Sequence, residues 1–137
     1  MANKLYPKWG EALLQFTAGA DLDGQTVKAA LLDTGTVAYN SAHDFYDDIS
    51  AGVGGTPVEI TTKTYTAGVF DGDNVTFTSV AGTVTYEAIV IFCDTGVPGT
   101  SRLVAYIDTG VTGLPVTSNG GNITVTWDNA GIFTITP

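Results

Sequence analysis

Residues 85–94, TYEAIVIFCD, form an almost continuous apolar run that ends in an aspartate. A second run of the same kind, RLVAYID, follows at residues 102–108. Strands with one exposed face alternate apolar and polar residues, whereas strands covered on both faces read as unbroken apolar runs. We therefore expect these two segments to be consecutive strands in the middle of a β structure.

Further strand patterns lie on both sides of this centre. The candidates are residues 25–33, 56–66, 74–80, 122–128 and 132–137. Ile123, Val125 and Trp127 alternate with threonines, as in a strand with one buried and one solvent-exposed face. The DNAG sequence that follows predicts a tight turn with Gly131 at positive φ, before residues 132–137 return as a strand. About seven or eight short strands with turns roughly every 8–12 residues predict an all-β protein, namely an antiparallel β-sandwich of jelly-roll type.

The composition suits a single packed domain and limits the choice of partners. Hydrophobic residues make up 44% of the 137 residues, enough for a self-standing core. Charged residues are only 14%, and the net charge is −9. Because such a surface repels phosphate groups, we expect no binding to nucleic acid or to anionic membranes. Cys93, the single cysteine, lies in an apolar run, so we expect a buried thiol and no internal disulfide.

The first 24 residues have a different pattern. Apolar side chains recur there at helical spacing: Leu5, Trp9, Leu13 and Phe16. Pro7 suits a first helical turn, so we expect a short amphipathic helix near residues 7–16. We divide the chain into an N-terminal arm, residues 1–24, and a β-sandwich domain, residues 25–137. The start of the chain lacks the pattern of a signal peptide, and no apolar run approaches the length of a membrane span.

Two interpretations of this helix stay open. In the first, the helix covers the end of the β core. In the second, it is an arm that docks on a partner, and a chain without residues 1–16 is expected to fold but not to bind. The interface residues of this arm are then Leu5, Tyr6, Pro7, Trp9 and Leu13. The glycine-rich segments near residues 51–55 and 119–121 are alternative contact surfaces.

The tripeptide Asp-Thr-Gly occurs three times, at Asp33, Asp94 and Asp108, each time after an apolar segment. Aspartic proteases carry their catalytic aspartate in this tripeptide, and a homodimer could supply the two carboxylates that share a proton. The residues after Gly35 depart from the protease signature, however, and three copies fit no symmetric pair. Because aspartate opens turns and glycine supplies unusual backbone angles, we interpret the copies as strand ends and predict no enzyme activity.

Residues 41–48, SAHDFYDD, contain the types of a catalytic triad in Ser41, His43 and Asp44. Triad members rarely come from neighbouring positions in a sequence. We expect a loop in which Asp44 caps a helical turn. The core anchors of this loop are then Phe45, Tyr46 and Ile49.

Two aspartate-rich segments are candidate calcium loops. Their possible ligands are Asp71, Asp73 and Asn74 in one segment, and Asp21 and Asp23 in the other. Neither has the regular ligand spacing or the bidentate glutamate of a helix-loop-helix calcium site. We favour plain turns, although calcium stays open, and one histidine with one cysteine cannot build a structural zinc site. We therefore predict no cofactor.

Three long segments, taken in order, resemble a known family. They are residues 26–50, 70–110 and 119–136, which together span most of residues 25–136. The characteristic motifs fall at Asp44–Asp48, Asp71–Phe77, Asp94–Asp108 and Thr124–Phe133. This order resembles a family of small structural proteins of tailed bacteriophages.

The resemblance implies a virion component that is made in the host bacterial cytoplasm and assembled on the capsid surface. Its function is then that of a head decoration or cement protein that binds the major capsid protein, with a homotrimer as the favoured oligomer. A tail or fibre component is the alternative, as is a β-sandwich module that recognises a host glycan. The motifs describe a fold rather than a chemistry, so they do not choose among these functions.

Overall fold

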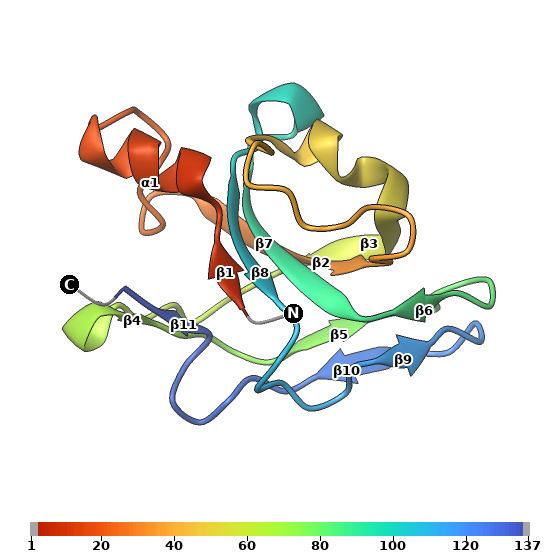
Figure 1. The fold of residues 1–137 in the computed structure, drawn as a ribbon. Coiled ribbons are helices and arrows are strands. Elements are labelled where there is room, and N and C mark those ends of the chain that lie inside the picture. The colour runs from red at the N-terminus through yellow and green to blue at the C-terminus, as the bar shows by residue number, and fades with distance from the viewer. Residues whose placement is uncertain (1–2, 136–137) are drawn as a thin grey trace.

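The structure is a computed structural model that describes residues 3–135. Its main element is a five-stranded antiparallel sheet with the strand order β1-β8-β7-β2-β3 (Figure 1). The strands of this sheet are β1 (Lys4–Leu5), β2 (Thr26–Leu32), β3 (Val53–Glu59), β7 (Ala88–Asp94) and β8 (Leu103–Ile107). The described residues contain one short α-helix, α1 (Pro7–Leu14), and the molecule has the expected all-β class.

Six short strands form three two-stranded antiparallel ladders that lie together below the sheet in Figure 1. The pairs are β4 (Val69–Phe70) with β11 (Phe133–Thr134), β5 (Val75–Phe77) with β10 (Ile123–Val125), and β6 (Thr85–Tyr86) with β9 (Val116–Thr117). The second sheet of a sandwich is thus represented by separate ladders. The sandwich and its jelly-roll connectivity therefore stay predictions.

The two apolar runs contain the central strands β7 and β8, as their sequence predicts, although the first two residues of the run at 85–94 form the separate strand β6. Successive side chains of a strand point to opposite faces, so each run contributes to two apolar clusters. On one face of β7, Ile89 and Ile91 pack toward the short ladders, together with Phe77 and Val125. On the other face, Val90 and its neighbours pack under residues 37–53. Both faces of the central sheet are therefore covered.

Short 3-10 turns complete the connections. They are Tyr46–Asp48, Ser50–Gly52, Thr66–Gly68 and Pro98–Thr100. The first confirms the helical turn expected in residues 41–50. Asp48, and not Asp44, holds this turn, because the Asp48 carboxylate accepts the backbone N–H groups of Asp44 at 2.9 Å and Phe45 at 3.4 Å. Of the three expected anchors, Ile49 is fully buried, whereas the other two are half-buried.

Two strand assignments from the sequence need correction. The strand expected at residues 56–66 lies at 53–59 instead, and Thr62 has a φ of 55° that no strand contains. Consequently the glycine-rich segment near 51–55 is not a loop: it enters β3, and its Gly54 is buried. The register against β2 shifts by two residues there, and Gly55 adopts a φ of 64° within this bulge.

The C-terminal hairpin is also different from the expectation. The turn itself is present, with Gly131 at a φ of 112° and its N–H bonded to the carbonyl of Asp128. The strands on its two sides do not pair with each other, however, because β10 pairs with β5 and β11 pairs with β4. The turn therefore joins two successive ladders of the lower layer.

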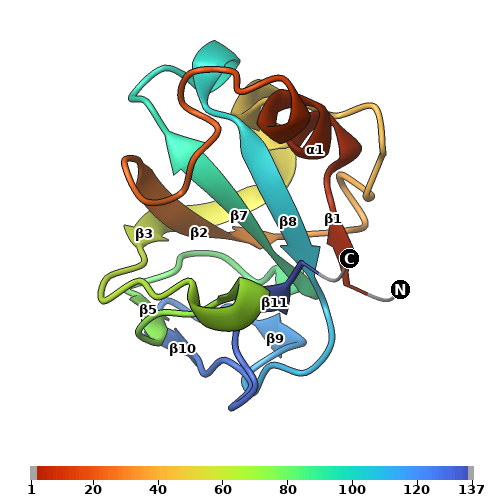
Figure 2. The ribbon, with the colours of Figure 1, turned by 90° about the vertical axis from the view of Figure 1, so that its left-hand side faces the viewer.

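The N-terminal segment belongs to the fold. Strand β1 pairs with the edge of β8, with Leu5 opposite Ala105, and α1 follows directly (Figure 2). Pro7 occupies the first turn of α1, where its missing N–H leaves no hydrogen bond unmade. Trp9 and Ala12 on the inner face of the helix are buried in the main apolar cluster. This supports the interpretation in which the helix covers the β core.

Candidate functional site

The three Asp-Thr-Gly copies end strands, as the sequence predicts. Asp33 follows β2, Asp94 is the last residue of β7, and Asp108 follows β8. Glycine supplies a positive φ in only two of the copies, at Gly96 and Gly110. In the first copy the backbone continues as a tight turn from Asp33, so the glycine there needs no special angle.

The positions of these aspartates separate them within one chain. Asp94 pairs with Thr26 at one end of β2, whereas Asp33 follows the other end, so roughly 20 Å of strand lies between them. Asp108 follows β8, which is two strands away from β2, and this sets it about 10 Å from Asp33. A proteolytic pair needs carboxylates within about 3 Å of each other. No two of the three copies form such a pair within the chain.

The carboxylate of Asp33 is used inside its own turn. It accepts hydrogen bonds from the Thr36 hydroxyl at 2.7 Å and the Gly35 N–H at 2.9 Å. The Thr36 hydrogen bond, more than the backbone bonds and against the effect of burial, lowers the pKa of Asp33 below its usual value. Asp33 is therefore an ionised turn-forming group.

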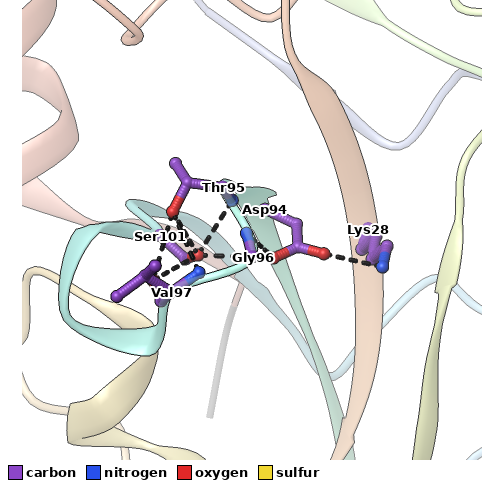
Figure 3. A network of polar contacts seen from close by, with 6 residues as sticks. All are labelled: Lys28, Asp94, Thr95, Gly96, Val97 and Ser101. Atoms are coloured by element: carbon purple, nitrogen blue, oxygen red, sulfur yellow. Dashed lines mark hydrogen bonds and ion pairs between the residues drawn. The ribbon is translucent and has the colours of Figure 1, made fainter.

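The Asp94 copy closes the β7–β8 connection through a wider network (Figure 3). One carboxylate oxygen accepts the Gly96 N–H at 2.9 Å and the Ser101 hydroxyl at 3.4 Å, while the other pairs with the Lys28 ammonium at 2.6 Å. Ser101, which is 1% exposed, also accepts the Thr95 N–H at 3.0 Å. The Lys28 ammonium, with the Gly96 N–H, holds the pKa of Asp94 below its usual range. This network fixes the hairpin between β7 and β8.

The other candidate sites are likewise engaged in local structure. In the part of the chain that the structure describes, Nδ1 of His43 has no hydrogen-bond partner, so no triad bond forms there. Asp73 accepts the hydroxyls of Thr61 and Thr62, and the side chain of Asn74 accepts the N–H of Trp127. Within residues 3–135, no group of three or more His, Cys, Asp or Glu side chains is placed to hold a metal ion.

Cys93 is buried, as predicted, and burial raises its pKa to about 11. Its thiolate is therefore scarcely populated at neutral pH, so Cys93 is a packing residue and not a nucleophile.

Among residues 3–135, no helix has the length and apolar character needed to cross a membrane.

The expected arm interface is mostly turned inward. Tyr6 is fully buried and Trp9 is 2% exposed, with the Trp9 indole N–H bonded to the carbonyl of Ala20 at 2.9 Å. Leu5 and Leu13 are half-buried against the main cluster, and only Pro7 is exposed. The arm interpretation places the side chains of Tyr6 and Trp9 against a partner, whereas in the structure the fold itself covers them. Removal of residues 1–16 would therefore take away part of the core.

Two other side chains of the same segment are exposed instead. Leu14 and Phe16, at the C-terminal end of α1, have 86% and 96% of their surface exposed. The helical repeat in the sequence placed Phe16 with the inward side chains. The helix ends at Leu14, however, so Phe16 no longer follows the inward stripe.

The end of α1 adopts a Schellman motif with Phe16 at its left-handed position. The N–H of Thr17 bonds to the carbonyl of Ala12 at 2.9 Å, and that of Phe16 to the carbonyl of Leu13 at 3.1 Å. Phe16 has a φ of 52°, a conformation in which glycine is preferred and a bulky residue is strained. The chain thus keeps a large apolar side chain, fully exposed, at a position that disfavours it. The sequence gives one indication of this left-handed position. No glycine directly follows the helical repeat, so a residue with a side chain takes the position that glycine usually occupies.

Comparison of the chain with protein-family models, with curated proteins and with solved structures finds no match in any of the three. The resemblance to phage structural proteins accordingly rests on the sequence motifs alone.

Proposed function

We propose that the chain is a structural protein of a bacteriophage virion, a decoration protein that binds the outer surface of the capsid and stabilises the shell. The order of the sequence motifs carries the phage assignment, and the exposed apolar pair at the end of α1, Leu14 and Phe16, supplies the contact surface. Adjacent exposed apolar side chains mark contact surfaces when they are large and close together. Strain at such a position indicates that something other than stability maintains the residue.

The pair is well placed for docking. It extends from a helix whose inner face is fixed in the core by Trp9 and Ala12, so its position relative to the sheet is set before a partner arrives. A contact residue on a rigid support loses less entropy on binding than one on a free arm. The proposed partner is the major capsid protein, and a homotrimer remains part of the proposal because a ring of copies could bury further apolar surface.

The proposal can be tested with capsids that lack this protein. Added wild-type chain is expected to co-sediment with them and to raise their resistance to heat. The double variant Leu14→Ser/Phe16→Ser is expected to fold normally and to lose at least tenfold in capsid affinity. Val97→Ser, which changes another exposed apolar side chain at the β7–β8 turn, is the matched control and should bind as the wild type does. Equal binding of the double variant would overturn the assignment of this surface.

The copy number in purified virions separates the proposal from its alternative. A decoration protein is present in hundreds of copies, whereas a tail or fibre component is present in few. Saturable binding to host cells or to host polysaccharide, together with a low copy number, would favour the alternative.

A further inference from the structure

A groove of about 260 Å³ lies beside the exposed pair, between α1 and the β4–β11 ladder. Both α1 and the β4–β11 ladder lie on the side of the molecule that Figure 2 turns toward the viewer. Its apolar lining includes Trp9, Leu13, Leu22, Tyr65, Phe70 and Phe133. We call it the α1 groove.

The lining of the α1 groove is rich in aromatic faces. The rings of Phe70 and Phe133 lie 5.2 Å apart, and Tyr65 continues the series at 5.9 Å from Phe70. Trp9 meets Phe133 edge-on, with ring centroids 5.8 Å apart. Because the Trp9 indole N–H is already bonded to the Ala20 carbonyl, Trp9 offers the groove its ring and no free donor. Rings of this kind attract cations through their negative faces.

Two exposed carboxylates, Asp21 and Asp23, also line the groove. Burial, followed by the negative charges of Asp23 and Asp21, raises the pKa of Tyr65, so both charges act on the aromatic lining. The Lys63 ammonium donates to the carbonyls of Leu22 at 2.9 Å and Gln25 at 2.7 Å, and its single positive charge offsets only part of the two negative charges. The mouth of an apolar groove is therefore negatively charged, in a chain whose net charge is −9.

We infer that the α1 groove binds an arginine side chain that the partner protein presents when the chain docks. A guanidinium group is flat and always charged, so it can stack on the exposed ring of Tyr65 while it pairs with the two carboxylates. The apolar stem of the arginine would cover the remaining lining.

The groove and Phe16 belong to one contact face. Leu13 and Asp21, which line the groove, also line the adjoining hollow that contains Phe16. A partner segment that covers Phe16 is therefore next to the mouth of the groove. The inference rests on the proposed function in one respect only, that the docking partner is a protein.

The test uses two blocked tripeptides as probes, acetyl-Leu-Arg-Leu-amide and acetyl-Leu-Gln-Leu-amide, titrated into the full chain and followed by NMR. The arginine peptide is expected to shift the indole N–H resonance of Trp9 and the resonances of Tyr65. It should bind at least tenfold more tightly than the glutamine peptide. Equal affinities, or shifts confined to other parts of the molecule, would overturn the inference.

Matched variants separate a specific site from general attraction to an acidic protein. Asp21→Asn/Asp23→Asn is expected to weaken binding of the arginine peptide about tenfold. Asp47→Asn/Glu59→Gln removes the same charge at exposed positions outside the groove and should leave the affinity unchanged. Tyr65→Leu keeps both carboxylates and should weaken binding several-fold. An equal loss in both double variants would reduce the effect to net charge and reject the groove.

Capsid binding tells the two proposals apart. If the chain binds capsids but the arginine peptide does not enter the groove, the inference fails and the proposed function stands. If the peptide enters the groove and Asp21→Asn/Asp23→Asn still binds capsids as the wild type does, the groove does not serve docking and the inference fails. If the peptide enters the groove but capsids are not bound, the capsid is the wrong partner and the groove retains its arginine specificity.

Discussion

Phe16 combines an unfavourable backbone conformation with an exposed side chain. A left-handed backbone disfavours side chains with a Cβ by roughly 1–2 kcal/mol, and glycine avoids this penalty. Most surface positions show no such conflict. Here the conflict predicts that stability and binding respond to substitution in opposite directions.

The variant Phe16→Gly is expected to raise the free energy of unfolding by about 1 kcal/mol, because glycine relieves the strain at the end of α1. The same change removes the exposed ring and should weaken capsid binding. Urea denaturation measures the first effect and co-sedimentation the second. A stabilised variant that binds at full strength would show that the ring has no part in docking.

Asp94 gives a prediction for the pH dependence of stability. Its pKa is lowered in the folded chain, mainly by Lys28, so its contribution is complete above the unfolded value of about 3.9 and is lost as the pH falls through the folded value. Asp94→Asn is expected to lower the free energy of unfolding by about 1 kcal/mol at pH 7, since a partly exposed pair and its hydrogen bonds contribute modestly. Urea denaturation at pH 7 and near pH 2 should show the difference between wild type and variant shrink in acid, as the pH falls toward the lowered folded pKa of Asp94.

Asp47→Asn is the control for this measurement, because Asp47 is an exposed aspartate of a neighbouring turn. Its effect at pH 7 should be within about 0.5 kcal/mol. A gap between wild type and Asp94→Asn that persists unchanged in acid would mean that the carboxylate charge is not what stabilises the hairpin.

Helix α1 is part of the core, which makes a prediction about its inner face. Trp9→Ala is expected to lower the free energy of unfolding by about 3–5 kcal/mol, because a buried indole and its hydrogen bond to Ala20 are lost. Leu14→Ala, in the same helix but 86% exposed, should change it by less than about 0.5 kcal/mol. Urea denaturation of the two variants compares them directly. Similar small effects in both would indicate a helix that is not anchored.

The sequence predicted those elements whose signal is local. The unbroken runs of β7 and β8 and the alternation of Ile123, Val125 and Trp127 depend only on which faces are covered, and all of them are confirmed. The end of α1 was less predictable, because a periodic pattern does not show that Phe16 leaves the helix. The aspartate turns were also predictable from a local signal, since an Asx turn involves neighbouring residues only.

Pairing between distant segments was not predictable in this way. The turn before Gly131 favoured a hairpin between the strands on its two sides, yet β11 pairs with β4 and β10 with β5. Similarly, the apolar side chains of Tyr6 and Trp9 suit either a partner surface or the chain's own core. Both choices are decided by segments far away in the sequence, and no local pattern reports them.

The acidic surface also affects how copies of the chain interact. With a net charge of −9 at pH 7, copies repel one another, but this repulsion vanishes near the isoelectric point of about 4.1. We expect self-association near that pH, driven by Leu14 and Phe16. Dynamic light scattering should show it in the wild type and much less of it in Leu14→Ser/Phe16→Ser. Equal self-association of the wild type and the double variant would show that another surface drives it.

The pairing of β1 with β8 has a consequence for synthesis on the ribosome. Leu5 is opposite Ala105, so the first strand cannot find its partner until about a hundred further residues have been made. At roughly 5–20 residues per second, this leaves the start of the chain without its neighbour for about 5–20 seconds. The apolar residues of α1 are uncovered during that interval and are open to chaperones or to misassembly with other nascent chains. Closure of the fold must therefore be among the last events after translation of β8.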